Sequence, residues 1–291
     1  MIKKLMTARR FIAAGVLSAF MFVGIASVNA QLTDGLVAHW PLDELNGDTT
    51  PDVISGYDMT ADNLTADSVV EGKYGNAMSF SNAEQTLLWR KNEEGDALPA
   101  NQHDSFTVSF WSKIQGNGQN DLRVFSESNT QGNNSPLFNI GTRNNGSDGT
   151  IDIYIRSIGG GGTVGHIFST AEPFDDEWHH VVFVQDDLAR SIYVDGELDD
   201  LEIAPKVEGD TDVDATTIGG ILRTTASHWV TGLIDDVAIW TRALSADEVS
   251  GLTSSGVPTP GGGGSTLLTG LTGYWPFEEG AGTTAANTAG G

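Results

Sequence analysis

The stretch Glu197–Glu202 has the acidic spacing that comes nearest to a catalytic pattern. It reads Glu-Leu-Asp-Asp-Leu-Glu, and a strand with one bulged residue would place Glu197, Asp199 and Glu202 on one face. Two carboxyl groups about 5–5.5 Å apart can cleave a glycosidic bond with retention of configuration. The same stretch also fits a solvated acidic arm of a hairpin, which would have no catalytic role.

A second carboxylate, Asp235, lies in an apolar segment that ends at Trp240. Strand alternation places Asp235 on the same face as Val237 and Ile239, so we expect it to point toward the core. A buried acid is costly unless it is paired or bound to a metal, and oxygen ligands suit Ca²⁺. The alternative is that Asp235 accepts hydrogen bonds from loop N–H groups without a metal.

A set of polar and aromatic residues could form a sugar-binding surface, because rings stack on sugars and polar groups orient them. The set consists of Trp89, Arg123, Tyr154, Arg156, His228 and Trp229. Each residue fits a core or rim position equally well, so the pattern does not assign the surface.

The segment from Trp178 to Ile203 contains the clearest strands. Val181 to Val184 is an unbroken apolar run, which predicts a strand covered on both faces. Asp195-Gly196 is a strong two-residue turn signal after the strand at 191–194, and the chain pairs back from Glu197. We therefore predict a three-stranded meander and place it at the heart of a sheet.

Further short strands, separated by Asn- and Gly-rich turns, extend over most of the chain. They are expected at 35–42, 77–80, 86–89, 105–111, 122–126, 137–141, 151–155, 164–168, 216–220 and 229–240. Helical periodicity is nearly absent, except after Ser245, which forms a capping box with Glu248. This pattern predicts an all-β, two-sheet antiparallel sandwich with one short C-terminal helix.

The composition favours an exported protein that does not bind nucleic acid. The chain has 291 residues, no cysteine and a net charge of −24. Four basic residues and no acidic ones precede an uncharged run in residues 1–30, and Val28-Asn29-Ala30 fits a signal-peptidase site. Removing this segment leaves 11 basic against 39 acidic residues, which disfavours a phosphate-rich partner. We expect a secreted protein, or one located in the periplasm or at the cell surface, with no membrane span after the signal is removed.

An internal repeat indicates more than one domain. Gly35-Leu36 and Trp40-Pro41 recur at an offset of 235 residues as Gly270-Leu271 and Trp275-Pro276. A Gly-, Pro- and Ser-rich stretch separates the two copies. We predict a signal peptide (1–30), a first domain (31–253), a flexible linker (254–269) and the truncated start of a second domain (270–291).

Four blocks occur in the order typical of one family: the Trp40 strand, Phe106–Trp111, Trp178–Gly196 and Gly232–Ser245. Together they resemble the laminin-G-like jelly roll of bacterial secreted proteins, in the concanavalin A-like lectin/glucanase superfamily. The resemblance implies a structural Ca²⁺ near the closing edge of the domain. Its matching positions here are Asp235, Asp43 and the turn that begins at Gly72.

The resemblance also bears on the acidic stretch, because glucanases of this superfamily use Glu-x-Asp-x-(x)-Glu on one strand. Here Asp200 stands where those enzymes carry an apolar residue, and the motif follows the Asp195-Gly196 turn late in the domain. We therefore predict a non-catalytic recognition module that binds polysaccharide, a cell-surface glycan or a surface protein. A glucanase that uses Glu197 and Glu202, and a purely structural spacer, are the alternatives.

Overall fold

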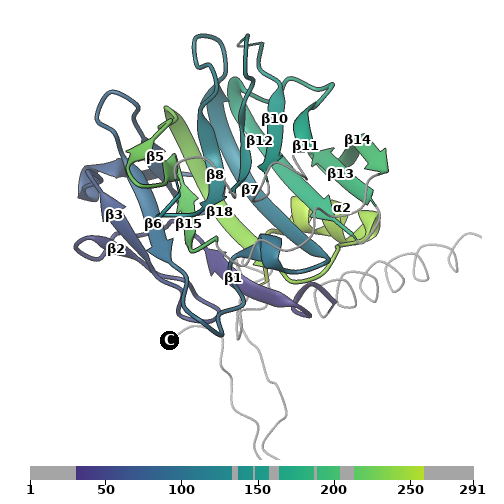
Figure 1. Cartoon of the computed structure of the whole chain (residues 1–291), viewed down its shortest axis with the longest axis horizontal. Coiled ribbons are helices and arrows are strands. Elements are labelled where there is room, and N and C mark those ends of the chain that lie inside the picture. Colours follow the sequence, from purple (N-terminus) through teal and green to yellow (C-terminus); the bar gives the residue numbers. More distant parts are fainter. Residues whose placement is uncertain are drawn as a thin grey trace, which may run out of the picture.

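Two antiparallel β-sheets pack face to face in the computed structural model of this chain (Figure 1). The structure describes residues 31–132, 137–146, 148–156, 164–186, 189–203 and 213–258. The predicted signal peptide, most of the linker and the start of the second domain lie outside these residues. The all-β sandwich with one short C-terminal helix is confirmed.

The first sheet has the order β14-β13-β12-β7-β18-β5-β4, with β1 also paired to β18. Its strands are β1 (Leu36–Trp40), β4 (Val69–Glu71), β5 (Asn76–Phe80), β7 (Phe106–Gln115), β12 (Asp175–Gln185), β13 (Ala189–Val194), β14 (Glu197–Ile203) and β18 (Gly232–Trp240). The meander β12-β13-β14 forms as predicted, but its position at the heart of the sheet is wrong. The meander instead forms one end of the sheet, because β14 is an edge strand, β13 lies next to it and β12 continues the sheet by pairing with β7.

The second sheet has the order β11-β10-β9-β8-β15-β6-β3-β2. Its strands are β2 (Thr49–Thr50), β3 (Met59–Asp62), β6 (Leu87–Lys91), β8 (Arg123–Ser128), β9 (Leu137–Thr142), β10 (Ile151–Arg156), β11 (Val164–Phe168) and β15 (Ala215–Ile218). A small hairpin of β16 (Ile221–Leu222) and β17 (Ala226–Ser227) follows β15. Two single 3-10 turns, η1 (Ala66–Ser68) and η2 (Ala100–Gln102), complete the connections.

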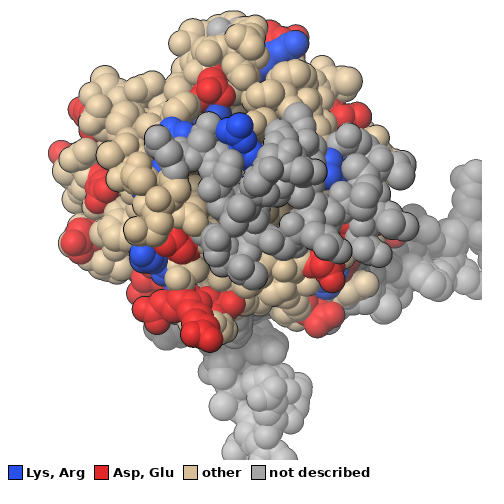
Figure 2. Space-filling view, in the orientation of Figure 1, with Lys and Arg blue, Asp and Glu red and all other residues tan. Residues whose placement is uncertain are grey.

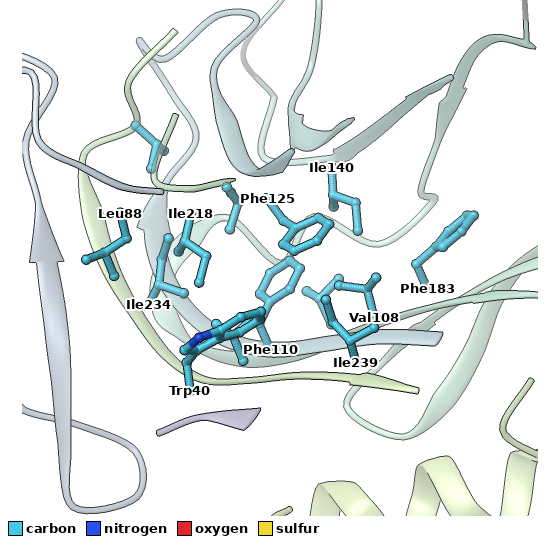
Figure 3. Close-up of a cluster of buried hydrophobic side chains, with 14 of the residues drawn as sticks. Trp40, Leu88, Val108, Phe110, Phe125, Ile140, Phe183, Ile218, Ile234 and Ile239 are labelled. Atoms are coloured by element: carbon cyan, nitrogen blue, oxygen red, sulfur yellow. The ribbon is translucent and has the colours of Figure 1, made fainter. Parts of the chain in front are cut away.

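The main hydrophobic core fills the space between the sheets. Trp40, Phe110 and Ile239 reach it from the first sheet, and Phe125 and Ile140 reach it from the second (Figure 3). All five side chains are buried. Burial of such side chains contributes about 1.5–3 kcal/mol each, so this layer supplies most of the stabilisation that holds the sheets together.

A second, smaller core lies on the other face of the first sheet, beneath helix α2 (Ala246–Ser255). It includes Val182 and Trp240 from the sheet and Val249 from the helix. Because β12 has a core on each face, Val181 and Phe183 enter the main core while Val182 and Val184 enter this one. This arrangement explains the unbroken apolar run, since both faces of the strand are buried.

The capping box at the start of α2 forms as predicted. The Ser245 side chain accepts a hydrogen bond from the Glu248 backbone N–H, and the Glu248 carboxylate accepts one from the Ser245 N–H. Arg242 adds a two-pronged contact to the Glu248 carboxylate, at 2.6 and 3.0 Å. The helix continues to Ser255 and so includes the first two residues of the predicted linker. No helix among the described residues is long and apolar enough to cross a membrane.

Candidate functional site

A cavity of about 240 Å³ opens on the outer face of the second sheet. It lies over β8 to β11, and the β16–β17 hairpin and its flanks form one wall. Its lining consists of Asp121, Arg123, Leu137, Asn139, Asn144, Tyr154, His166, Ile221, Arg223 and His228. Polar and aromatic groups therefore dominate the cavity, as expected of a site that orients a polar ligand.

Strand alternation points these side chains outward. Phe138 and Ile140 of β9 enter the core, so Asn139 between them faces the cavity. Tyr154 likewise lies between the buried residues Ile153 and Ile155 of β10. The rigid second sheet thus positions the floor of the cavity.

Tyr154 and His166 form an aromatic platform on this floor. Their rings stack with centroids 4.4 Å apart and planes 19° from parallel. The Nδ1 atom of His166 lies 2.8 Å from the buried Asp152 carboxylate, and its Nε2 atom lies 3.1 Å from the Asn144 amide nitrogen. These partners assign the proton of a neutral imidazole to Nδ1 and fix the ring orientation. The platform is therefore held in place before any ligand arrives.

A connected polar group forms the opposite side of the cavity. Arg123 donates from Nη2 to the Asp121 carboxylate at 2.7 Å, and Asp121 lies 3.7 Å from His228 Nε2. Arg223 donates from Nη2 to Ser227 Oγ at 2.9 Å and lies 3.4 Å from His228 Nδ1. One carboxylate and one imidazole thus lie between two guanidinium groups.

The electrostatics of this group are positive. Burial lowers the pKa of Arg223, and the nearby charge of Arg123 lowers it further. Burial also lowers the pKa of His228, followed by the charges of Arg123 and Arg223, while Asp121 opposes them. Each shift has the sign expected of a cation or imidazole close to other cations.

Three of the six residues predicted for a sugar-binding surface line the cavity: Arg123, Tyr154 and His228. Three lie outside its lining. Trp89 on β6 donates its indole N–H to Asp62, Arg156 ends β10, and Trp229 bridges to the Arg123 backbone. His166, Asn139, Asn144, Asp121 and Arg223 were missed. Outward alternation on β9 could have indicated Asn139, whereas no sequence signal places the hairpin residue Arg223 over the sheet.

The predicted orientation of Asp235 toward the main core is wrong. A bulge in β18 lies between Asp235 and Ala238, with Asp236 at a positive φ of 54°. The extra residue reverses the alternation, so Ile234 and Val237 face the main core while Asp235 faces the α2 side. Asp235 remains fully buried there.

Asp235 meets the turn between β4 and β5. Its Oδ2 accepts hydrogen bonds from the N–H groups of Lys73 and Tyr74 at 2.7 and 2.9 Å, whereas its Oδ1 is buried without a hydrogen-bond partner. Burial raises the pKa of Asp235 to about 7; the two amide hydrogen bonds lower it, and the charges of Asp236 and Asp43 raise it. The carboxylate caps the turn, as in the metal-free interpretation, while its Oδ1 has no hydrogen-bond partner.

The other predicted ligands meet the same turn. Asp43 Oδ1 accepts a hydrogen bond from the Asn76 N–H at 2.6 Å. A Cβ at Gly75 would lie 2.3 Å from Asp43 Oδ1, and one at Gly72 would lie 2.7 Å from Asp235 Oδ2. Side chains at both glycines would therefore displace these carboxylates. Within the described residues no group of three or more acidic, His or Cys side chains could hold a metal, so a cation here would also need backbone carbonyls.

The acidic stretch 197–202 forms the edge strand β14, away from the cavity lining. The predicted bulge is present, since Ile192 pairs with Asp200 and Tyr193 with Leu198, which leaves Asp199 as the extra residue. The Asp199 carboxylate accepts hydrogen bonds from the Thr170 and Ala171 N–H groups, both at 2.7 Å. Asp199 is thus engaged in holding a turn.

Residues 92–250 match the family model described as the concanavalin A-like lectin/glucanases superfamily, Laminin_G_3. The chain belongs to this family. Its matched region runs from the end of β6 into α2 and includes most of the cavity-forming strands. No curated protein matches the chain.

Several solved structures share this superfamily fold at low sequence identity. The binding domain of botulinum neurotoxin DC in complex with SialylT aligns with a TM-score of 0.56 and 16% identity, over 77% of this chain and 52% of that chain. The binding domain of Paraclostridial mosquitocidal protein 1 gives 0.57 and 18%, over 77% and 53%. Trypanosoma rangeli sialidase gives 0.55 and 16%, over 84% and 39%. The chain thus spans about half or less of each of these structures, and the likeness concerns the fold.

Proposed function

We propose that this chain is a glycan-binding module of an exported multidomain protein, and that it does not hydrolyse its ligand. The cavity over β8 to β11 carries this proposal. It combines a fixed aromatic platform, Tyr154 on His166, with hydrogen-bonding groups such as Asn139 and Arg123 around it. Sugars are bound by this combination, because their C–H faces stack on rings while their hydroxyl groups need polar partners.

The fold and the predicted export support this role. Two of the structures that share the fold are binding domains, one of a neurotoxin in complex with SialylT and one of a mosquitocidal protein. The predicted signal peptide would place the module where polysaccharides and cell surfaces are found. A single shallow site should bind in the millimolar to micromolar range, about −4 to −8 kcal/mol. Repeated modules on a linker would raise the overall avidity.

A glycan array followed by calorimetric titration tests the binding. Tyr154→Ala removes one ring of the platform and should weaken glycan binding about tenfold or more, since an aromatic contact contributes about 1–2 kcal/mol. Trp89→Ala is the matched control, because it removes an aromatic residue of the same sheet outside the cavity. Equal losses in both variants, or no glycan bound by the parent protein, would contradict the proposal.

The absence of hydrolysis is tested separately with mixed-linkage glucan and laminarin, by measuring reducing ends. We expect no turnover, because Asp199 in the only glucanase-like stretch is engaged with residues 170–171. Turnover that disappears in Glu197→Gln would instead establish a glucanase. If the protein shows neither turnover nor glycan binding, a spacer or a protein-binding role replaces the proposal.

We also propose that Ca²⁺ stabilises the module at Asp235, with Asp43 and the Gly72–Gly75 turn as its surroundings. The support is the buried Asp235 Oδ1 that lacks a partner, next to a turn that admits no side chain at either glycine. The ion would neutralise the Asp235 and Asp43 carboxylates and would connect β18 to the β4–β5 turn.

Thermal unfolding with and without chelator tests the calcium proposal. Ca²⁺ at a hundredfold excess over Kd would add about 2.7 kcal/mol, so chelator should lower Tm by several degrees. Asp235→Asn should abolish this response, whereas Asp214→Asn, which removes an acid just before β15 of the second sheet, should retain it. If chelator does not change the Tm of the parent protein, the calcium proposal is wrong and Asp235 only caps the turn.

A further inference from the structure

We propose that the cavity over β8 to β11 selects sugars that carry a carboxylate, such as uronic or sialic acids. Arg123 and Arg223 would bind the carboxylate while the sugar ring lies on Tyr154. This inference rests on the proposed glycan-binding function and names the class of its ligand.

The first support is the convergence of two arginines from distant parts of the chain. Arg123 begins β8, and Arg223 lies in the hairpin that stands over the sheet. Asp121 and His228 lie between them: Asp121 accepts a hydrogen bond from Arg123 at 2.7 Å, and His228 lies 3.7 Å from Asp121 and 3.4 Å from Arg223. The hairpin therefore adds the guanidinium group of Arg223 to a cavity that already contains that of Arg123.

The second support is the charge of the cavity compared with that of the whole protein. The lining has two arginines, Arg123 and Arg223, and one acid, Asp121, while the Asp152 carboxylate lies buried behind His166. The chain as a whole carries −24. Figure 2 shows acidic groups around much of the visible margin and basic groups only in scattered places. Two arginines in one cavity of such an acidic protein would favour an anionic ligand at this point over the rest of the surface.

The third support is the match of shapes. A guanidinium group is planar and carries five N–H donors in a fork that fits a carboxylate. Asn139, with its amide oriented to satisfy its neighbours, accepts from Arg123 Nε at 3.2 Å. Together with Asp121 it holds the Arg123 guanidinium in one orientation. A fixed fork loses little entropy when it binds, and the aromatic platform lies in the same cavity to receive the attached ring.

The test is a calorimetric titration of the whole chain with matched pairs of oligosaccharides. Trigalacturonate is compared with galactotriose, and sialyllactose with lactose, at low and high salt. We expect at least one acidic sugar to bind about tenfold or more tightly than its neutral partner, because hydrogen bonds to charged groups are the stronger class. Added salt should reduce this preference.

Substitutions test whether Arg223 is responsible for the preference for the acidic sugar. Arg223→Gln should abolish the preference for the acidic sugar, and Arg223→Lys should retain only part of it, because lysine lacks the fork. Lys91→Gln is the matched control, since it removes a basic residue of the same sheet outside the cavity. The comparison of sugars on the parent protein does not depend on any variant folding.

The outcomes separate this inference from the proposed function. Equal affinity for acidic and neutral sugars, with Tyr154→Ala still weakening both, would overturn the carboxylate assignment and leave the glycan-binding function. A sulfated sugar that binds as tightly as the uronate would overturn the carboxylate as the selected group. No binding of any sugar would contradict both.

Discussion

Acid should destabilise this protein through one buried histidine, His180. Its side chain is 1% exposed, its Nε2 lies 2.8 Å from Ser109 Oγ, and its Nδ1 lies 2.6 Å from Thr253 Oγ1. One face stacks on Trp111 with centroids 4.9 Å apart. Burial lowers the pKa of His180 from 6.5 to about 4, while Asp236 and Asp195 raise it and Lys73 lowers it. The native state therefore keeps the imidazole neutral.

The size and sign of the effect follow from linkage. Between about pH 6.5 and pH 4 the unfolded chain binds a proton at His180 and the native state does not, so the free energy of unfolding falls as the pH falls. A shift of this size corresponds to about 3 kcal/mol across the window, at 1.36 kcal/mol per pKa unit. Asp235, whose pKa is raised, contributes a slope of the opposite sign.

Urea unfolding, followed by tryptophan fluorescence at pH 7, 6, 5 and 4, measures this contribution by comparing the parent protein with His180→Gln. Glutamine retains a donor and an acceptor but does not titrate, and Asp235 is present in both proteins, so its contribution cancels in the difference. We expect the variant to be the less stable protein at pH 7 and the gap to shrink by about 3 kcal/mol at pH 4. A gap that stays constant within about 0.5 kcal/mol would refute the reasoning.

Three further changes test the packing. Ser245→Ala removes the N-cap of α2 and its bond from the Glu248 N–H, so we expect a loss of about 1 kcal/mol in chemical denaturation. Gly219→Ala places a Cβ 2.1 Å from the Phe80 ring at a φ of +85°, and calorimetry should show a lower Tm from a loss of about 1–3 kcal/mol. The Glu127 carboxylate accepts hydrogen bonds at 2.6 and 3.0 Å from the two amides that begin η2. Glu127→Gln weakens these bonds and should lower the free energy of unfolding in urea by about 2 kcal/mol. An unchanged midpoint would show that the charge is not needed.

The elements that the sequence predicted well are those with strong local signals. The apolar run at Val181–Val184 and the capping box at Ser245 each depend on neighbouring residues, and both formed as expected. Strands β2, β3 and β4 were missed because they are two to four residues long and show no sustained alternation. They form by pairing with neighbouring strands: β2 with β3, β3 with β6 and β4 with β5. Such pairing leaves little trace in so short a segment.

The candidate sites were less predictable, for two physical reasons. One bulged residue reverses every side chain beyond it, and nothing near Asp236 announces the bulge, since aspartate adopts a positive φ only in certain contexts. The cavity depends on a hairpin that returns over the second sheet, so Arg223 meets Arg123 only after the chain has folded. Strand alternation could place the cavity side chains that lie on the second sheet, but not those of the hairpin wall.

The pairing of β1 with β18 has a mechanical consequence. Leu36, where the described chain enters β1, pairs with Trp240, where the chain leaves β18, and the Leu32 carbonyl accepts the Trp240 indole N–H at 2.7 Å. The residues that lead into β1 and out of β18 are therefore at the same end of one antiparallel ladder, whose hydrogen bonds run perpendicular to the strands. A load applied through these residues would open the bonds one after another, like a zipper, and would not strain them together in shear. Under tension such a module would yield early and lengthen, and would thereby spare the attachment at its binding face.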